Sequence, residues 1–123
     1  MKKLSIITVN KNNAEGLRKT IESVVCQTFK DFEYIVIDGA STDESVAVIE
    51  TYLANVTYWV SKPDRGIYEA INKGIKVAVG EYCLFLNSGD YLSSDSILEK
   101  AFSYGFFEDI VYGDVIFENH LKY

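Results

Sequence analysis

Segments typical of buried strands alternate along this chain with segments typical of amphipathic helices, and this alternation limits the possible folds more than any other feature. The first strand-like segment, "LSIITV" (4–9), is rich in branched residues and fits a strand buried on both faces. Further strands are expected at 32–38, 56–60 and 81–86 and near 109–113, with helices between them. This order predicts an α/β fold of the Rossmann-like kind: three layers, with a mainly parallel sheet and helices on both faces.

Three helix starts are marked by residues that commonly cap helices. Asn12, with Glu15 three residues further on, predicts the first start as a capping box. The segment "STDE" (41–44) predicts the second start in the same way. Asp64 is the expected N-cap of the third helix. Four residues of the second helix are expected to face inward: Val46, Val48, Ile49 and Leu53.

The size and charge of the chain exclude several classes of protein. With 123 residues, 48% of them hydrophobic, the chain is expected to form a single domain, residues 1–123, around one core. A net charge of −6 argues against binding to nucleic acid, which needs clustered Lys and Arg. Cys26 and Cys83 lack metal-type spacing and are expected to be buried thiols. Neither a secretory signal nor a transmembrane segment is apparent, so a cytoplasmic protein is expected.

Polar residues follow several of the expected strands at the point where each strand ends. Thr8–Asn10 end the first strand, Asp38 and Gly39 end the second, and "NSGD" (87–90) ends the fourth. In parallel sheets, ligands bind beyond the carboxyl ends of the strands. The turn "PDRG" (63–66) opens the helix before the fourth strand and could reach the same edge. The sequence therefore predicts a binding site at this edge of the sheet.

Three kinds of site could use that edge. A dinucleotide-binding domain needs the glycines of G-x-G-x-x-G after its first strand, and "NKNNAEG" (10–16) lacks them. A phospho-acceptor receiver domain needs an acidic pair after its first strand, where this chain has Asn10 and Lys11. The third kind places the base and ribose of a nucleotide against the first two strands, with its diphosphate and a metal ion at "NSGD" (87–90).

The motifs at this edge resemble those of a known enzyme family in order and spacing. They are "ITVNKNNAEGLRKTIESVVCQTF", "EYIVIDGASTDES", "SKPDRGIYEAINKGIKVAVGEYCLFLNSGD" and "VYGD". Together they resemble the N-terminal half of a family 2 glycosyltransferase with the GT-A fold, of the type that builds bacterial capsule, O-antigen or exopolysaccharide. The resemblance implies inverting transfer of a sugar from a nucleotide-sugar, with UDP-sugar as the expected donor, to a glycan or lipid-linked acceptor. It also allows peripheral attachment to the inner face of the membrane.

The resemblance implies contacts to the nucleotide from six residues at the ends of the first two strands and in the "PDRG" turn: Thr8, Val9, Asn10, Asp38, Asp64 and Arg65. Asp38 would accept the N3–H of uracil, and Thr8 and Val9 would line the base pocket. Each also has an ordinary structural explanation, since Asp38 could cap a turn and Thr8 could simply pack in its strand. Arg65 is the more telling residue, because a cation at a helix N-terminus opposes the helix dipole and suggests a partner.

The turn "NSGD" corresponds in the resemblance to the D-x-D motif that binds a divalent cation. Asn87, Ser88 and Gly89 would contact the nucleotide, and Asp90 is the one carboxylate left to bind Mn²⁺ or Mg²⁺. The cation would neutralise charge on the departing nucleoside diphosphate. Binding of the metal without the nucleotide is expected to be weak.

The sequence identifies no catalytic residue. The general base of the resembled family comes after the nucleotide-binding half, so we expect it beyond the end of this chain, which would then be truncated. Asp114 is explained more simply by a surface turn, with a position facing the acceptor as the alternative, and His120 is assigned no role. Uncovered apolar surface could drive formation of a homodimer. The alternative function is a non-catalytic domain that keeps the GT-A fold for protein association.

Overall fold

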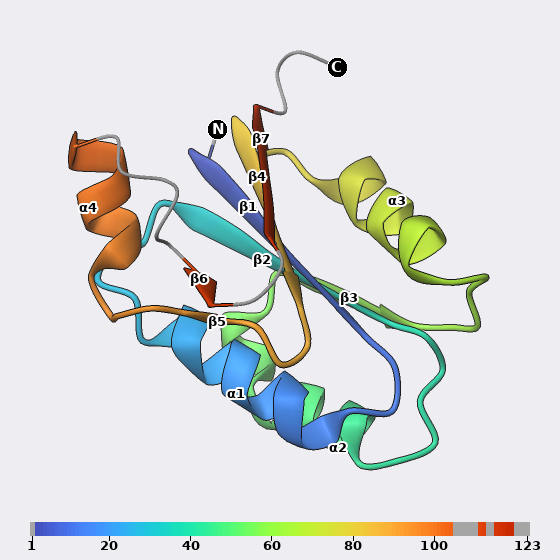
Figure 1. The fold of residues 1–123 in the computed structure, drawn as a ribbon. Helices are drawn as coiled ribbons and strands as arrows, with labels where there is room; N and C mark the ends of the chain where they lie inside the picture. The colour runs from blue at the N-terminus through green and yellow to red at the C-terminus, as the bar shows by residue number, and fades with distance from the viewer. Residues whose placement is uncertain (1, 105–110, 113–114, 120–123) are drawn as a thin grey trace.

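The computed structural model describes residues 2–104, 111–112 and 115–119. Its strands are β1 (Leu4–Asn10), β2 (Phe32–Asp38), β3 (Tyr58–Ser61), β4 (Tyr82–Asn87), β5 (Tyr91–Leu92), β6 (Val111–Tyr112) and β7 (Val115–Asn119). Its helices are α1 (Ala14–Val25), α2 (Ser45–Thr51), α3 (Ile67–Val77) and α4 (Ile97–Tyr104), with a 3₁₀ turn at Leu53–Asn55. The predicted alternation of strands and helices is confirmed (Figure 1).

The main sheet is mostly parallel, as predicted. Its strand order is β3-β2-β1-β4-β7, and only β7 runs antiparallel, along the outer side of β4. The chain moves from β1 to β2 and β3 on one side, then crosses back to place β4 on the other side of β1. The direction of the winding therefore changes between β1 and β4. At that point the carboxyl ends of both strands lie level, with Val9 opposite Asn87.

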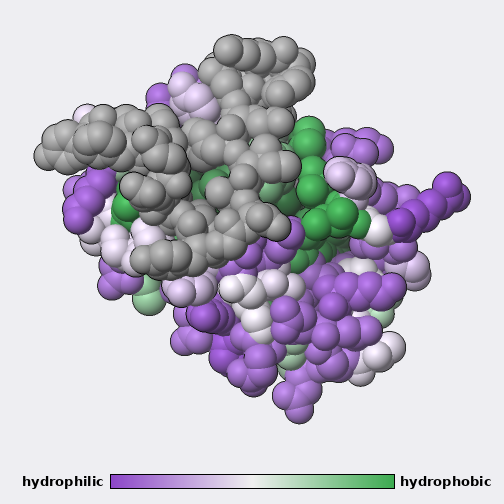
Figure 2. Space-filling model, in the orientation of Figure 1, coloured by the Kyte–Doolittle hydropathy of each residue, from purple (hydrophilic) through white to green (hydrophobic). Residues whose placement is uncertain are grey.

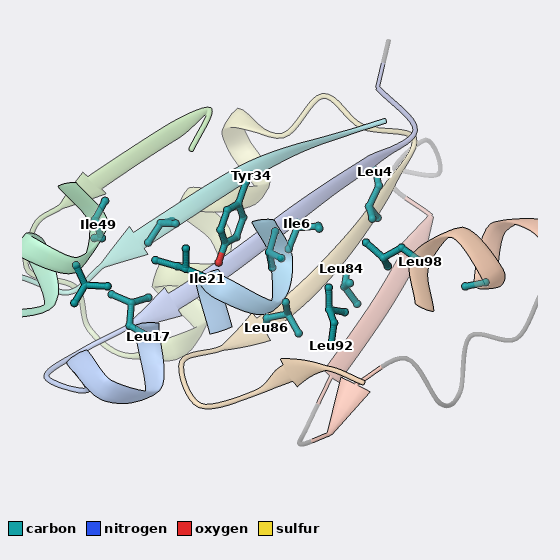
Figure 3. Packing of buried hydrophobic residues seen from close by; sticks show 14 residues of the cluster. Leu4, Ile6, Leu17, Ile21, Tyr34, Ile49, Leu84, Leu86, Leu92 and Leu98 are labelled. Carbon is teal, nitrogen blue, oxygen red and sulfur yellow. The ribbon is translucent and has the colours of Figure 1, made fainter. Parts of the chain in front are cut away.

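Helices cover both faces of the sheet and form two hydrophobic clusters. On one face, Leu17 of α1, Val48 of α2 and Leu98 of α4 pack against Ile6 and Tyr34 in the larger cluster. Figure 3 shows side chains from β1, β2, β4 and α1 gathered in this cluster. On the other face, α3 packs over a smaller cluster: Ile7, Val9, Ile35, Ile37, Ala70, Ala78, Cys83 and Phe85. These clusters make the three-layer arrangement that the sequence predicted.

The first helix is capped one residue later than predicted. Asn13, not Asn12, is its N-cap, and the side-chain oxygen of Asn13 accepts the N–H of Gly16 at 3.1 Å. Asn12 takes a left-handed conformation with a φ of 50°, which Asn tolerates better than most residues. Its Oδ1 instead accepts the backbone N–H of Thr42 at 2.7 Å. Asn12 thus ties the loop after β1 to the loop after β2.

The second helix is shorter than the sequence suggests, and "STDE" does not form a capping box. The cap residue Glu44 makes no side-chain hydrogen bond, and Asp43 accepts the N–H of Ser45 at 2.9 Å instead. Because the helix ends at Thr51, Leu53 falls in the 3₁₀ turn and is 51% exposed. The prediction that Leu53 faces the core is therefore wrong.

The strand expected near 109–113 is present among the described residues as β6, which pairs with β5 outside the main sheet. The expectation for one of the two cysteines needs correction. Cys83 is buried as expected, whereas Cys26 is exposed. Figure 2 shows hydrophobic surface in the region where Figure 1 draws α3 and the strands beside it. Over the described ranges, no helix combines the length and hydrophobicity needed to cross a membrane.

Candidate functional site

A cavity of about 270 Å³ opens at the carboxyl ends of β1 and β4, against the first turn of α3. Nine residues line it: Val9, Asn10, Lys11, Asp64, Gly66, Ile67, Ala70, Asn87 and Ser88. It lies where the winding of the sheet changes direction, which is the usual position of ligand sites in open α/β sheets. The predicted location of the site is therefore matched by a cavity in the structure.

The ten residues predicted for the site fall into two groups. Five of them line the cavity: Val9, Asn10, Asp64, Asn87 and Ser88. The other five do not: Thr8, Asp38, Arg65, Gly89 and Asp90. Four further residues line the cavity and are not among the predicted ten: Lys11, Gly66, Ile67 and Ala70.

Asp38 is completely buried, and its carboxylate is occupied by neighbouring protein groups. Oδ1 accepts hydrogen bonds from Asn10 Nδ2 at 2.8 Å and Ser41 Oγ at 2.7 Å. Oδ2 accepts from the Ser41 N–H at 2.8 Å and from Ser61 Oγ at 2.7 Å. The carboxylate thus holds together the ends of β1, β2 and β3. This geometry gives no support to the predicted contact between Asp38 and a uracil base.

These hydrogen bonds stabilise the ionised form of Asp38. Burial alone would raise the pKa of the carboxyl group, but the bonds from Ser41, Asn10 and Ser61 together outweigh burial and lower it. A carboxyl group whose pKa is lower in the folded than in the unfolded chain stabilises the fold above its unfolded pKa, near 4. That contribution is lost as the pH falls through the folded pKa.

We therefore expect a melting temperature that changes little between about pH 7 and 5 and falls steeply below about pH 4. Differential scanning fluorimetry over this pH range would measure it. Asp38→Asn, which cannot ionise, should show a shallower fall at acid pH. If the melting temperature of that variant fell just as steeply below about pH 4, other carboxylates would be responsible for the loss of stability.

Thr8 points away from the cavity. It is fully buried, and its hydroxyl lies 2.8 Å from the hydroxyl of Tyr34, which belongs to the larger cluster on the α1 face. Burial raises the pKa of Tyr34 well above its ordinary value, so this phenol stays neutral. The Thr8 side chain therefore does not line this cavity, whereas Val9, on the α3 face, does. A contact between the Thr8 backbone and the base stays a prediction.

Asn10 joins the cavity wall to the Asp38 hydrogen bonds. The residue is only 6% exposed, and its Nδ2 donates to Asp38. That bond fixes the orientation of the amide and leaves Oδ1 as a buried acceptor with no partner among the described residues. An unsatisfied buried acceptor is costly in a folded protein.

Asp64 and Arg65 lie in the turn before α3. Asp64 is not the N-cap, since Gly66 occupies that position with a φ of 125°, which favours glycine. Asp64 Oδ1 accepts the N–H of Gly66 at 3.2 Å, so the carboxylate shapes the turn from outside the helix. The side chain of Arg65 is 94% exposed, with Nε 4.0 Å from Glu69. Arg65 thus lies near a surface carboxylate, at the limit of an ion pair, and its contact with the nucleotide stays a prediction.

The turn after β4 is closed by its own aspartate and anchored to α1. Asp90 Oδ2 accepts the N–H of Asn87 at 3.1 Å, and Gly89 has a φ of 104°. Thr20 Oγ1 of α1 accepts the N–H of Gly89 at 2.9 Å and donates to the carbonyl of Asp90 at 2.6 Å. Asn13 Nδ2 donates to the carbonyl of Ser88 at 3.3 Å. Helix α1 therefore sets the position of this turn.

The donor set at this turn does not suffice for a metal ion on its own. Across the described residues, no group of three or more His, Cys, Asp or Glu side chains is arranged to hold a metal. Asp90 is the one carboxylate in the turn, and it already accepts a backbone hydrogen bond. Such a turn can contribute one ligand to a cation whose other ligands are phosphate oxygens and water. Asp114 and His120 lie outside the described residues.

Comparison with known proteins places the chain among glycosyltransferases. The family model described as "Glycosyl transferase family 2" matches residues 5–118. An uncharacterized glycosyltransferase of Mycobacterium tuberculosis is 39% identical over 99 residues, covering 80% of this chain and 38% of that protein. The poly(ribitol-phosphate) beta-N-acetylglucosaminyltransferase TarP of Staphylococcus aureus is 40% identical over 110 residues, covering 85% of this chain and 33% of TarP.

Solved structures agree with the sequence matches. The structure of S. aureus TarS residues 1–349 in complex with UDP-GlcNAc aligns with a TM-score of 0.74 and 27% identity. The alignment covers 82% of this chain and 30% of the TarS chain. The chain thus spans less than half the length of these relatives. The family model matches nearly the whole of this chain, and the identity to TarP supports that match. This chain therefore belongs to glycosyl transferase family 2.

Proposed function

We propose that this chain forms the donor-binding part of an inverting glycosyltransferase that uses a UDP-sugar. The observation that carries the proposal is the cavity at the β1/β4 edge, between the turn after β4 and the start of α3. The complex of TarS with UDP-GlcNAc supports a uridine nucleotide, because the aligned part of that chain has the same fold as this one and is 27% identical to it.

The nucleotide would lie across the carboxyl edge of the sheet. Its diphosphate would approach the turn at 87–90, where Gly89 lets the backbone come close and Lys11 supplies a positive charge on the cavity wall. Its base would lie toward β2, beside Asn10 and Asp64. A divalent cation, Mn²⁺ or Mg²⁺, would bind Asp90 only together with the diphosphate, and when bound it would neutralise charge on the departing nucleoside diphosphate.

The acceptor in this proposal is a glycan or lipid-linked molecule of the cell surface. The name of TarP, which is 40% identical, describes transfer of N-acetylglucosamine to a poly(ribitol-phosphate) polymer. The general base that removes the proton of the acceptor hydroxyl is assigned to none of the described residues, so this part of the enzyme would bind the donor without completing catalysis. A cytoplasmic location, where nucleotide-sugars are made, belongs to the same proposal.

Calorimetric titration of the chain with UDP, with and without Mn²⁺, tests this function. We expect UDP to bind about tenfold more tightly when Mn²⁺ is present, a difference of about 1.4 kcal/mol, because one carboxylate alone holds the cation poorly. GDP and CDP serve as matched controls and should bind more weakly. If no nucleotide binds with or without the metal, the alternative gains support: a GT-A domain kept for protein association.

A further inference from the structure

Polar side chains of α1 and of the turn after it bond to the backbone of the segment that follows β4. They do so in chain order: Thr20 with Gly89 and Asp90, Ser23 with Leu92, and Gln27 with Ser94 and Leu98. Figure 1 shows β5, which belongs to this segment, alongside α1. Of the three side chains, Thr20 is the one that reaches the turn at 87–90, where the proposed diphosphate and cation would bind.

The hydroxyl of Thr20 joins two successive backbone groups of that turn. Oγ1 accepts the N–H of Gly89 at 2.9 Å and donates to the carbonyl oxygen of Asp90 at 2.6 Å. A threonine within a helix commonly donates to the carbonyl four residues earlier, and here that carbonyl, of Gly16, is further away at 3.0 Å. Since the hydroxyl has one hydrogen, the shorter distance favours Asp90 as its acceptor. The hydroxyl thus serves the turn rather than its own helix.

Thr20 holds the end of the turn that carries the Asp90 carboxylate. The N–H of Asp90 donates to the carbonyl of Asn87 at 2.9 Å, and Asp90 Oδ2 accepts the N–H of Asn87 at 3.1 Å. These two bonds close the turn on itself. At its near end, the N–H of Ser88 donates to the carbonyl of Val9 in β1 at 3.0 Å. At its far end, the Asp90 carbonyl accepts the Thr20 hydroxyl. Loss of this hydroxyl would therefore weaken the attachment of the end that bears the carboxylate.

We infer that Thr20 is a positioning residue for the proposed diphosphate and cation: its hydroxyl keeps Asp90 where the carboxylate can bind a divalent cation together with the diphosphate. The inference rests on the proposed function. Thr20 is fully buried and does not line the cavity, so it would act through Asp90 rather than touch the ligand. Because the turn offers the cation one carboxylate, a small displacement of that carboxylate is not compensated by another. Groups that orient a metal ligand commonly change metal affinity by about 10–100-fold when they are removed.

Thr20→Val gives the sharpest test, because valine has nearly the shape of threonine and lacks the hydroxyl. Calorimetric titration gives the Kd of UDP without and with Mn²⁺, and the ratio of the two measures the help that the cation provides. We expect this ratio to fall from about ten in the wild-type chain to about two or less in Thr20→Val. The affinity for UDP without the metal should change by less than about twofold, because Thr20 does not line the cavity.

A conservative variant and a matched control separate positioning from packing. Thr20→Ser restores the hydroxyl and should keep a ratio of at least about five. Ser23→Ala removes another hydroxyl of α1, whose Oγ accepts the N–H of Leu92 at 3.1 Å, two residues beyond Asp90. This control should keep a ratio of about ten even where it loses stability. Urea denaturation shows that each variant is folded, and Thr20→Ala provides the same test if Thr20→Val does not fold.

The outcomes are distinct. A folded Thr20→Val chain that keeps a ratio of about ten would overturn the inference. UDP binding that weakens equally with and without Mn²⁺, or a Thr20→Ser chain no better than Thr20→Val, would also overturn it by making Thr20 a packing residue. The same loss in Ser23→Ala would overturn it by assigning the effect to α1 as a whole. A wild-type chain whose affinity for UDP does not depend on Mn²⁺ would instead contradict the proposed function, and the inference with it.

Discussion

Asp38→Ala is expected to lower the free energy of unfolding by about 3–5 kcal/mol, since it leaves buried donors without a partner and each costs about 1–3 kcal/mol. The donors come from the ends of β1 and β3 and from the loop after β2: the amide of Asn10, the hydroxyl of Ser61, and the backbone and hydroxyl of Ser41. Nucleotide binding should be lost in parallel, because Asn10 forms part of the cavity wall and would no longer be held.

Urea denaturation measures the loss of stability, and Asp31→Ala is the matched control because Asp31 is exposed at the opposite edge of the sheet. The control should change the free energy of unfolding by no more than about 0.5 kcal/mol. A stable Asp38→Ala variant that had merely lost nucleotide binding would argue the reverse: that Asp38 contacts the base directly, as the family resemblance suggested.

Gly80→Ala should be almost as damaging, for a reason of space rather than charge. A β-carbon at Gly80 would lie 2.5 Å from the backbone nitrogen of Ser5 and 2.6 Å from the carbonyl carbon of Leu4. Backbone atoms cannot rotate away, so β1 and the entry to β4 would have to separate. The hydrogen bond from the Gly80 N–H to Ser5 Oγ, at 2.7 Å, would be strained as well. We expect a loss of about 3 kcal/mol, at the upper end of the range for overpacking.

Thermal and urea unfolding would both report this change. Val79→Ala is the control, because Val79 is 59% exposed and its backbone N–H keeps its bond to Glu33 when the side chain is shortened. It should cost less than about 1 kcal/mol. If Gly80→Ala were as stable as this control, the close approach of the two strands described here would be wrong.

The strands and the sheet edge were predictable because near-continuous apolar segments are distinctive and the edge follows from topology. The orientation of individual side chains at that edge was harder to predict. In a strand buried on both faces, hydrophobicity does not show which face a residue takes. Thr8 shares the face of Ile6, and Val9 shares the face of Ile7. Side chains alternate between the two faces along β1, so assigning Ile7 to the α3 side would also have placed Val9 there and Thr8 on the α1 side.

The role of Asp38 could not be predicted from its position in the sequence. A carboxylate at a strand end suits either a ligand or a loop, and the choice depends on Ser41 and Ser61, which tertiary structure brings to it. The carboxylate of Asp64 lies against Gly39, 25 positions earlier in the chain. No local sequence pattern predicts a contact between residues so far apart. The spacing of Arg65 and Glu69, four residues apart in the sequence, is the local signal for the contact between them.

One face of the sheet holds most of the hydrophobic core, whereas the cavity lies at the edge of the sheet and on the other face. The larger cluster beneath α1 and α2 contributes none of the residues that line the cavity, which come from strand ends, loops and the first turns of α3. Substitutions at the cavity can therefore alter what is bound while most of the buried apolar contacts persist. A chain built in this way can acquire a preference for a new donor through a few changes in its loops, and its descendants can diverge in substrate while inheriting one scaffold.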